Sequence, residues 1–131
     1  MKTALNLITL LLTSALSAGE LPPETAAKYL KVIASTAGNK VSCRDAALKA
    51  ALEGAGIKVD GDAKVIWATN PLEIKSNKGK LVVVGRRDML AAGGCIAILE
   101  EGGKTKIYLN QPAILASGVA LSDMIYKVGE K

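Results

Sequence analysis

The sequence predicts an α/β fold: a single domain with a mostly parallel sheet, helices packed on it, and a C-terminal β-hairpin that adds an antiparallel edge. Strand-like and helix-like segments alternate through the first two thirds of the chain. Residues 81–84 (LVVV) form a continuous apolar run, which is typical of a strand covered on both faces. Near the C-terminus, two apolar segments flank Gly102 and Gly103, a pair that suits a tight hairpin turn.

The N-terminal segment predicts export. Met1 and Lys2 precede an uncharged stretch, residues 3–19, with a leucine-rich centre and small residues at its end. This order is typical of a secretory signal peptide, and the stretch is too short and too interrupted to span a bilayer. We expect residues 1–18 to be cleaved and residues 19–131 to form the single domain, which is then exported as a free, soluble protein. No cysteine lies near this site for lipid attachment, and a buried N-terminal helix is the alternative.

The mature elements follow in chain order. Pro22, Pro23 and Glu24 suit a helix start, and Gly38 suits its end. Ser42 and Asp45 form a capping pattern before the next apolar helix. Asn70 and Pro71 end the strand expected over residues 64–69, and a polar stretch, residues 73–80, follows. We expect helices over residues 24–33, 46–55, 113–117 and 123–128. We expect strands over residues 41–43, 57–59, 64–69, 81–84, 95–99 and 106–109.

Composition restricts the chemistry. The chain has 131 residues, no histidine and two cysteines. Ser-His-Asp triads, Cys-His dyads and His-containing zinc sites are therefore excluded, and two cysteines cannot form a four-cysteine metal site. We expect no catalytic residue, no metal site and no cofactor, and hence no enzyme.

Basic residues exceed acidic ones, with 17 Lys+Arg against 12 Asp+Glu and a net charge of +5. Most are scattered, as on a solvated surface, so nucleic acid is not an expected partner. The denser interval contains Lys75, Lys78, Lys80, Arg86 and Arg87. Its two arginines follow the strand 81–84, and ligands and partners of open α/β sheets often bind at the carboxyl ends of strands. They are therefore candidate partner-binding residues, with an ordinary charged loop as the alternative.

Trp67 and the two cysteines are the remaining single candidates. Trp67 is a possible partner-binding anchor, although its position in an apolar strand favours core packing. Cys43 and Cys95 lie at strand edges, and export to an oxidising compartment permits a disulfide between them. We expect this disulfide; the alternative is two buried thiols that act as small apolar side chains.

The last third resembles a known family. The segments LVVVG (residues 81–85), GGCIAILE (93–100), KIYLN (106–110) and GVALS (118–122) are similar, in order and spacing, to the closing half of YfiR-like periplasmic proteins. The similarity covers residues 80–128, with a weaker one over residues 26–33 and 40–56. The short passage 70–80 departs from the family and suggests the loss of one β-α unit. Gly93, Gly94, Asn110 and Gly118 are the matched motif residues, and we expect structural roles for them: close backbone approach, a cap and a helix stop.

This resemblance implies a function. YfiR-like proteins bind the periplasmic sensor domain of an inner-membrane signalling enzyme, typically a diguanylate cyclase, and hold it inactive. An oxidisable Cys43–Cys95 pair would suit such a switch. The alternative is a stand-alone periplasmic binding module for a small anionic ligand or another envelope component, with Arg86 and Arg87 as contacts. Either function is compatible with a homodimer of this protein.

Overall fold

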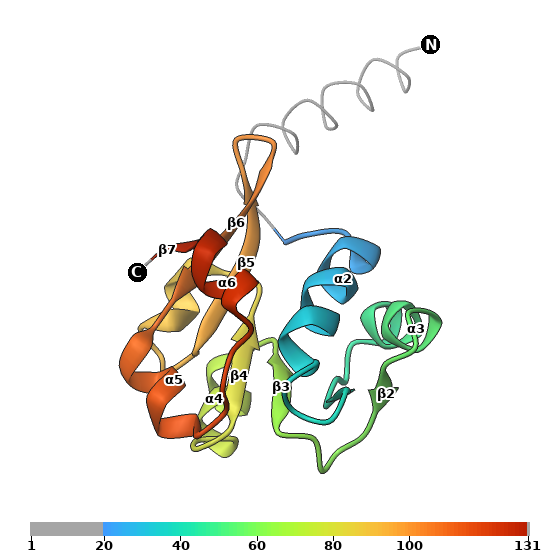
Figure 1. The fold of residues 1–131 in the computed structure, drawn as a ribbon, viewed down its shortest axis with the longest axis horizontal. Coiled ribbons are helices and arrows are strands. Elements are labelled where there is room, and N and C mark those ends of the chain that lie inside the picture. Colours follow the sequence, from blue (N-terminus) through green and yellow to red (C-terminus); the bar gives the residue numbers. More distant parts are fainter. Residues whose placement is uncertain (1–19, 131) are drawn as a thin grey trace, which may run out of the picture.

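A computed structural model describes residues 20–130 and shows a single α/β domain (Figure 1). Two sheets are present, one with the order β1-β2 and one with the order β3-β4-β5-β6-β7. An isolated parallel bridge between Ser42 and Ile66 joins β1 to β3. The strands therefore follow one another as β2-β1-β3-β4-β5-β6-β7, and the fold class predicted from the sequence is confirmed.

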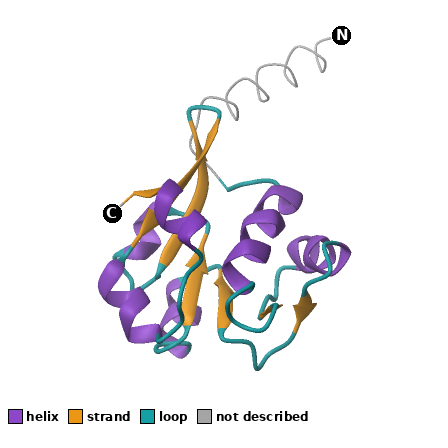
Figure 2. Cartoon of the chain, viewed as in Figure 1, coloured by secondary structure: helices purple, strands orange, loops and turns teal. Residues whose placement is uncertain are grey.

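The strands are short and the helices flank them (Figure 2). The strands are β1 (Lys40–Val41), β2 (Lys58–Val59), β3 (Val65–Ala68), β4 (Leu81–Val84), β5 (Ile96–Glu101), β6 (Lys104–Leu109) and β7 (Gly129–Glu130). The helices are α2 (Pro23–Ala34), α3 (Ala46–Gly54), α4 (Pro71–Ser76), the 3-10 helix η1 (Arg87–Leu90), α5 (Gln111–Ser117) and α6 (Asp123–Val128). No helix among residues 20–130 is long and apolar enough to cross a membrane.

The strand order places helices on both faces of the sheet. The connection β1-α3-β2 leads from β1 to the neighbour on the side away from β3. The connection β3-α4-β4 leads from β3 to the neighbour on the side away from β1, which is the opposite direction along the sheet. Because parallel crossovers are right-handed, these opposite directions put α3 and α4 on opposite faces. Helix α2 packs against α3 on the first face. The order reverses between β1 and β3, which is therefore the topological switch point of the fold.

Strand β4 lies at the centre of the core. Its residues Leu81–Val84 are all buried, at 0 to 1% exposure, and they pair in parallel with β3 on one side and β5 on the other. A strand covered on both faces needs an apolar side chain at every position, which explains the uninterrupted LVVV run.

The closing half contains the predicted hairpin. Strands β5 and β6 pair antiparallel from Ile96↔Leu109 to Glu101↔Lys104. Gly102 and Gly103 form the turn with φ values of 59° and 78°, a left-handed conformation at both positions that glycine adopts without strain. Figure 1 shows the hairpin tip extending beyond the rest of the sheet. Helices α5 and α6 then lead to β7, which pairs in parallel with β6.

The passage after Asn70, described from the sequence only as a polar stretch, contains helix α4. The side chain of Asn70 accepts a hydrogen bond from the Glu73 N–H at 2.9 Å. The Glu73 carboxylate in turn accepts hydrogen bonds from the amide and hydroxyl of Thr69. This reciprocal capping, with Pro71 in the first turn, stabilises the start of the helix. No helix was predicted there, because the capping pattern was not recognised beside the polar residues that follow.

Two smaller expectations also differ. Helix α3 is capped by Asp45, whose carboxylate accepts from the Leu48 N–H at 3.1 Å, and not by Ser42, which forms the bridge to β3. Val128, within a helix expected to cover the sheet, is 54% exposed, whereas Ile125 is buried. The predicted signal peptide, residues 1–18, lies outside the described residues.

Candidate functional site

The arginines predicted as partner-binding residues lie where expected, at the carboxyl end of β4. Arg86 donates two hydrogen bonds to Asp88, from Nε to Oδ1 at 3.1 Å and from the second guanidinium nitrogen to Oδ2 at 2.8 Å. These bonds lower the pKa of the Asp88 carboxyl and raise the pKa of Arg86. Both side chains are more than half exposed. The pair therefore presents both signs of charge at the surface.

Arg87 has a different partner. Its guanidinium carbon lies 4.2 Å from the ring centroid of Tyr108 on β6, a cation–π contact. The Tyr108 hydroxyl donates a hydrogen bond to the carboxylate of Glu101, near the tip of the hairpin. The contacts Arg87–Tyr108–Glu101 therefore connect η1 with both strands of the hairpin.

These residues surround a shallow hollow of about 540 Å³ at this end of the molecule. We call it the arginine surface; it is lined by Glu20, Gly85, Arg86, Arg87, Asp88, Leu99 and Glu101. Its charges are mixed, because two arginines stand among three carboxylates. Such a surface suits a polar protein partner better than a small anion, which would compete with Asp88 for Arg86.

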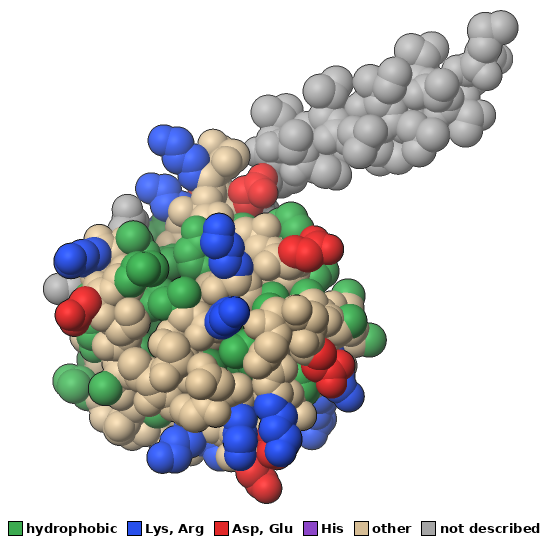
Figure 3. All heavy atoms as spheres, turned by 45° about the vertical axis from the view of Figure 1, so that its right-hand side comes forward, with side chains coloured by type: hydrophobic (Ala, Val, Ile, Leu, Met, Phe, Trp, Pro, Cys, Tyr) green, Lys and Arg blue, Asp and Glu red, His purple; other side chains and the backbone are tan. Residues whose placement is uncertain are grey.

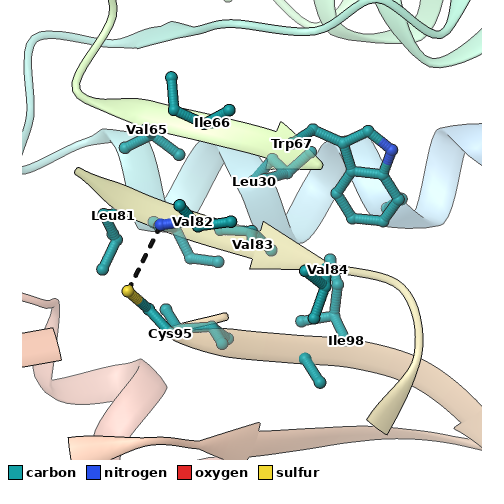
Figure 4. Packing of buried hydrophobic residues seen from close by; sticks show 14 of the residues in the cluster. Leu30, Val65, Ile66, Trp67, Leu81, Val82, Val83, Val84, Cys95 and Ile98 are labelled. Atoms are coloured by element: carbon teal, nitrogen blue, oxygen red, sulfur yellow. Dashed lines mark hydrogen bonds between the residues drawn. The ribbon is translucent and has the colours of Figure 1, made fainter. Parts of the chain in front are cut away.

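Trp67 lies near the arginine surface but in the core. It is 5% exposed, and a Cβ added to Gly85 would lie 3.2 Å from its ring. Figure 4 shows the indole extending past the end of β3, with Leu30 close by. Its Nε1 is buried without a hydrogen-bond partner among the described residues. The position matches core packing, the alternative weighed against an interface anchor.

The expected disulfide between Cys43 and Cys95 is absent: both cysteines are free and buried. Cys43 follows β1 and Cys95 precedes β5, so β3 and β4 lie between them. With neighbouring strands about 4.8 Å apart, the two positions are separated by roughly 14 Å, whereas a disulfide requires Cα atoms within about 7 Å. Burial raises the pKa of both thiols.

The strand register supports this separation. Ser42 pairs with Ile66, and Ile66 pairs with Val82, which is aligned with Cys95. Cys95 therefore lies three strands across the sheet from the residue that precedes Cys43. The prediction failed because strand order is not visible from two positions at strand edges.

The four motif residues of the family resemblance hold the closing half together. Gly93 has φ 114°, and a Cβ on Gly94 would lie 3.1 Å from the Met89 carbonyl oxygen. The Asn110 side chain caps α5 and donates to the carbonyl oxygens of Gly94 at 3.1 Å and Leu90 at 3.4 Å. Gly118 ends α5 with φ 70°. These are the structural roles expected for them.

The structure adds a crevice that the sequence did not indicate. It lies at the switch point, holds about 420 Å³, and takes its lining from the ends of β1 and β3, from α4 and from the turn after β2. Arg44 and Lys49 supply positive charge to it, and Glu73 supplies negative charge. No sequence signal could have identified it, because the crevice depends on the pairing of β1 with β3. Among residues 20–130, no three His, Cys, Asp or Glu side chains are grouped to hold a metal ion.

Comparisons with known proteins add a fold likeness. No protein-family model and no curated protein matches this chain. A solved structure, the ABC domain in complex with L-Trp from Streptococcus pneumonia, is similar with a TM-score of 0.63 at 12% sequence identity. The alignment covers 84% of this chain and 60% of that one, so this chain spans about three fifths of that domain. At this identity the likeness shows the fold alone.

Proposed function

We propose that this protein is exported to the periplasm and acts without catalysis, by binding the periplasmic domain of an inner-membrane signalling enzyme of the diguanylate cyclase type and holding it inactive. The YfiR-like resemblance over residues 80–128 implies this function. It is supported by the roles of Gly94, Asn110 and Gly118, because the residues that match the family are those that fix the geometry of the closing half.

One observation favours partner binding at the arginine surface: the exposed Arg87 stacked on Tyr108 beside the Arg86–Asp88 pair. Arginine and tyrosine are enriched at the energetic centres of protein interfaces. Both arginines are held in place by contacts within the chain, so less side-chain entropy is lost when a partner binds. The mixed charges select a partner surface that also carries both signs.

The test combines capture with activity. The tagged protein is used to capture a membrane-anchored cyclase from envelope extract, and cyclic dinucleotide synthesis by that cyclase is then measured with and without the purified protein. We expect repression by the wild type and at least about tenfold weaker repression by Arg87→Ala. Arg44→Ala removes an exposed arginine that does not line this surface and is the matched control.

Two outcomes contradict the proposal. One is that no signalling enzyme is captured, or that a captured cyclase is equally active with the protein present. The other is that Arg44→Ala weakens repression as much as Arg87→Ala does, which would place the contact away from the arginine surface.

The second candidate function is a stand-alone periplasmic module that binds a small anionic ligand. The arginine surface does not favour it, since Asp88 already occupies Arg86. What favours it is a second basic group, at the other end of β4, which has no acidic side chain within its lining.

A further inference from the structure

The basic interval of the sequence is divided by strand β4 into two separate groups. Lys75, Lys78 and Lys80 precede the strand, and Arg86 and Arg87 follow it. Four extended residues span about 13 Å, so the two groups lie at opposite ends of the sheet. On the face of the molecule shown in Figure 3, Lys and Arg side chains do not merge into one continuous stripe. The lysine group therefore has its own surroundings.

The three lysines border a groove of about 490 Å³ between α4 and α5. We call it the lysine-rimmed groove. It is lined by Pro71, Ile74, Lys75, Lys78, Gly79, Lys80, Val82, Ala91, Ala92, Gly93, Cys95, Ala113 and Ala116. Helix α5 contributes only alanines, Ala113 and Ala116, to its wall. Its volume is within the range of about 300 to 1,000 Å³ that is usual for small-molecule sites.

The floor of the groove is apolar. Val82 and Cys95 are 1% and 2% exposed, and Ile74 on α4 is 3% exposed. The polar groups at this floor are already paired: the Val82 N–H donates to Cys95 Sγ at 3.4 Å (Figure 4), and the Cys95 thiol donates to the Lys80 carbonyl oxygen at 3.6 Å. These side chains close the bottom of the groove and have almost no surface of their own left to bury. The apolar surface that a ligand can cover comes from the exposed lining residues Pro71, Ala91, Ala92 and Ala116.

The rim of the groove is positive. Its lining contains three lysines and no Asp or Glu. The lysines are exposed, and the ion pairs found among residues 20–130 involve Lys40, Lys58 and Arg86 instead. Glu73, on the same helix as Lys75, has its carboxylate engaged by Thr69 and Asn70. A concave site lined by charge of one sign attracts the opposite charge more strongly than an open surface does.

We propose that the lysine-rimmed groove binds an amphiphilic anion, a molecule with an apolar chain and a single carboxylate. The chain lies along Pro71, Ala91, Ala92 and Ala116, above the buried floor. The carboxylate lies among the ammonium groups of Lys75, Lys78 and Lys80. This assignment deepens the second candidate function by naming its ligand class, and it holds whether or not the protein also represses a cyclase.

The test uses isothermal titration calorimetry of the mature protein with decanoate, decanol and decyltrimethylammonium, each below its aggregation concentration. We expect decanoate to bind at least about tenfold more tightly than decanol, and decyltrimethylammonium to bind most weakly. Decanoate affinity falls as salt is raised from 0.05 to about 0.5 M, because the rim charges are exposed to solvent.

Variants separate the two halves of the site. The triple variant Lys75→Gln/Lys78→Gln/Lys80→Gln reduces decanoate affinity to that of decanol and removes the salt dependence. Ala116→Leu, at an exposed helical position that tolerates leucine, fills the groove and weakens both ligands about tenfold. Lys28→Gln/Lys31→Gln/Lys127→Gln removes the same charge elsewhere and leaves decanoate affinity within about twofold.

Three results would overturn the proposal: no decanoate binding, equal affinity for decanoate and decanol, or equal loss in the two triple-lysine variants. None of them bears on the arginine surface, so cyclase repression tests the first proposed function independently.

Discussion

Replacing Asn110 by alanine tests whether one side chain holds the closing half together. In the wild type its Oδ1 accepts from the Ala113 N–H at 3.4 Å, and its Nδ2 donates to Gly94 O at 3.1 Å and Leu90 O at 3.4 Å. Loss of a helix N-cap costs about 1 kcal/mol, and loss of the shorter bond from Nδ2 costs about 1 kcal/mol more. The 3.4 Å bond from Nδ2 to Leu90 O is long and adds little. We therefore expect Asn110→Ala to lower the free energy of unfolding by about 2 kcal/mol.

The measurement is urea unfolding followed by the fluorescence of Trp67, which is 5% exposed in the folded state and is the sole tryptophan. For a domain of this size the same loss lowers the thermal midpoint by roughly 8 °C. Asn70→Ala is the matched control. It removes the N-cap of α4, a bond of 2.9 Å to the Glu73 N–H, without any bond to a distant segment. We expect it to cost about 1 kcal/mol.

The comparison of Asn110→Ala with Asn70→Ala shows whether the bonds from Asn110 to the loop before β5 contribute to stability. If Asn110→Ala costs no more than Asn70→Ala, Asn110 is an ordinary helix cap and its bonds to the loop before β5 contribute nothing measurable. That result would also weaken the structural argument for the motif residues of the closing half.

Two further predictions concern the cysteines and the glycines. Mass spectrometry of non-reduced protein should find Cys43 and Cys95 as free thiols. Burial raises the pKa of each thiol, so less thiolate is present at a given pH than in an unfolded cysteine peptide. Alkylation of the folded protein should therefore be slower than alkylation of that peptide. A disulfide-linked peptide would contradict the sheet order. Gly94→Ala should cost about 1 to 3 kcal/mol in urea unfolding, because its Cβ would lie 3.1 Å from the Met89 carbonyl oxygen and 3.2 Å from both Cγ atoms of Val84. Gly61→Ala, with no atom within 4 Å of the added Cβ, should be neutral or slightly stabilising, and equal effects of the two substitutions would mean that the approach at Gly94 is not tight.

Local chemistry explains which elements could be predicted. The features that were predicted correctly all act through neighbours in sequence. They are Pro23 and Glu24 at the start of α2, the LVVV run of β4, the Gly102-Gly103 turn, and Gly118 at the end of α5. Helix α4 escaped prediction although its signal was also local. Asn70 and Glu73 form a reciprocal cap, and a polar composition concealed it.

The candidate sites could be predicted only in part. Arg86 and Arg87 were identified by their place after an apolar strand, and they lie there. The partner of Arg87 was not identified, because Tyr108 is 21 residues further along the chain, on another strand. Lys75, Lys78 and Lys80 were noted as part of one basic interval. Strand β4 lies between the lysines and the arginines in the sequence, so it places the two groups at opposite ends of the sheet.

Periodicity, capping residues and turn glycines in the amino-acid sequence were sufficient to specify an α/β domain with a C-terminal hairpin, because these interactions join residues only a few positions apart. Which strands are neighbours, which face each side chain takes and where the helices leave a groove depend on contacts between distant segments. The separation of Cys43 from Cys95 and the gathering of three lysines around an alanine-walled groove are both results of that packing. Residue type supplied the thiols and the charges, and the order β2-β1-β3-β4-β5 determined what they can reach.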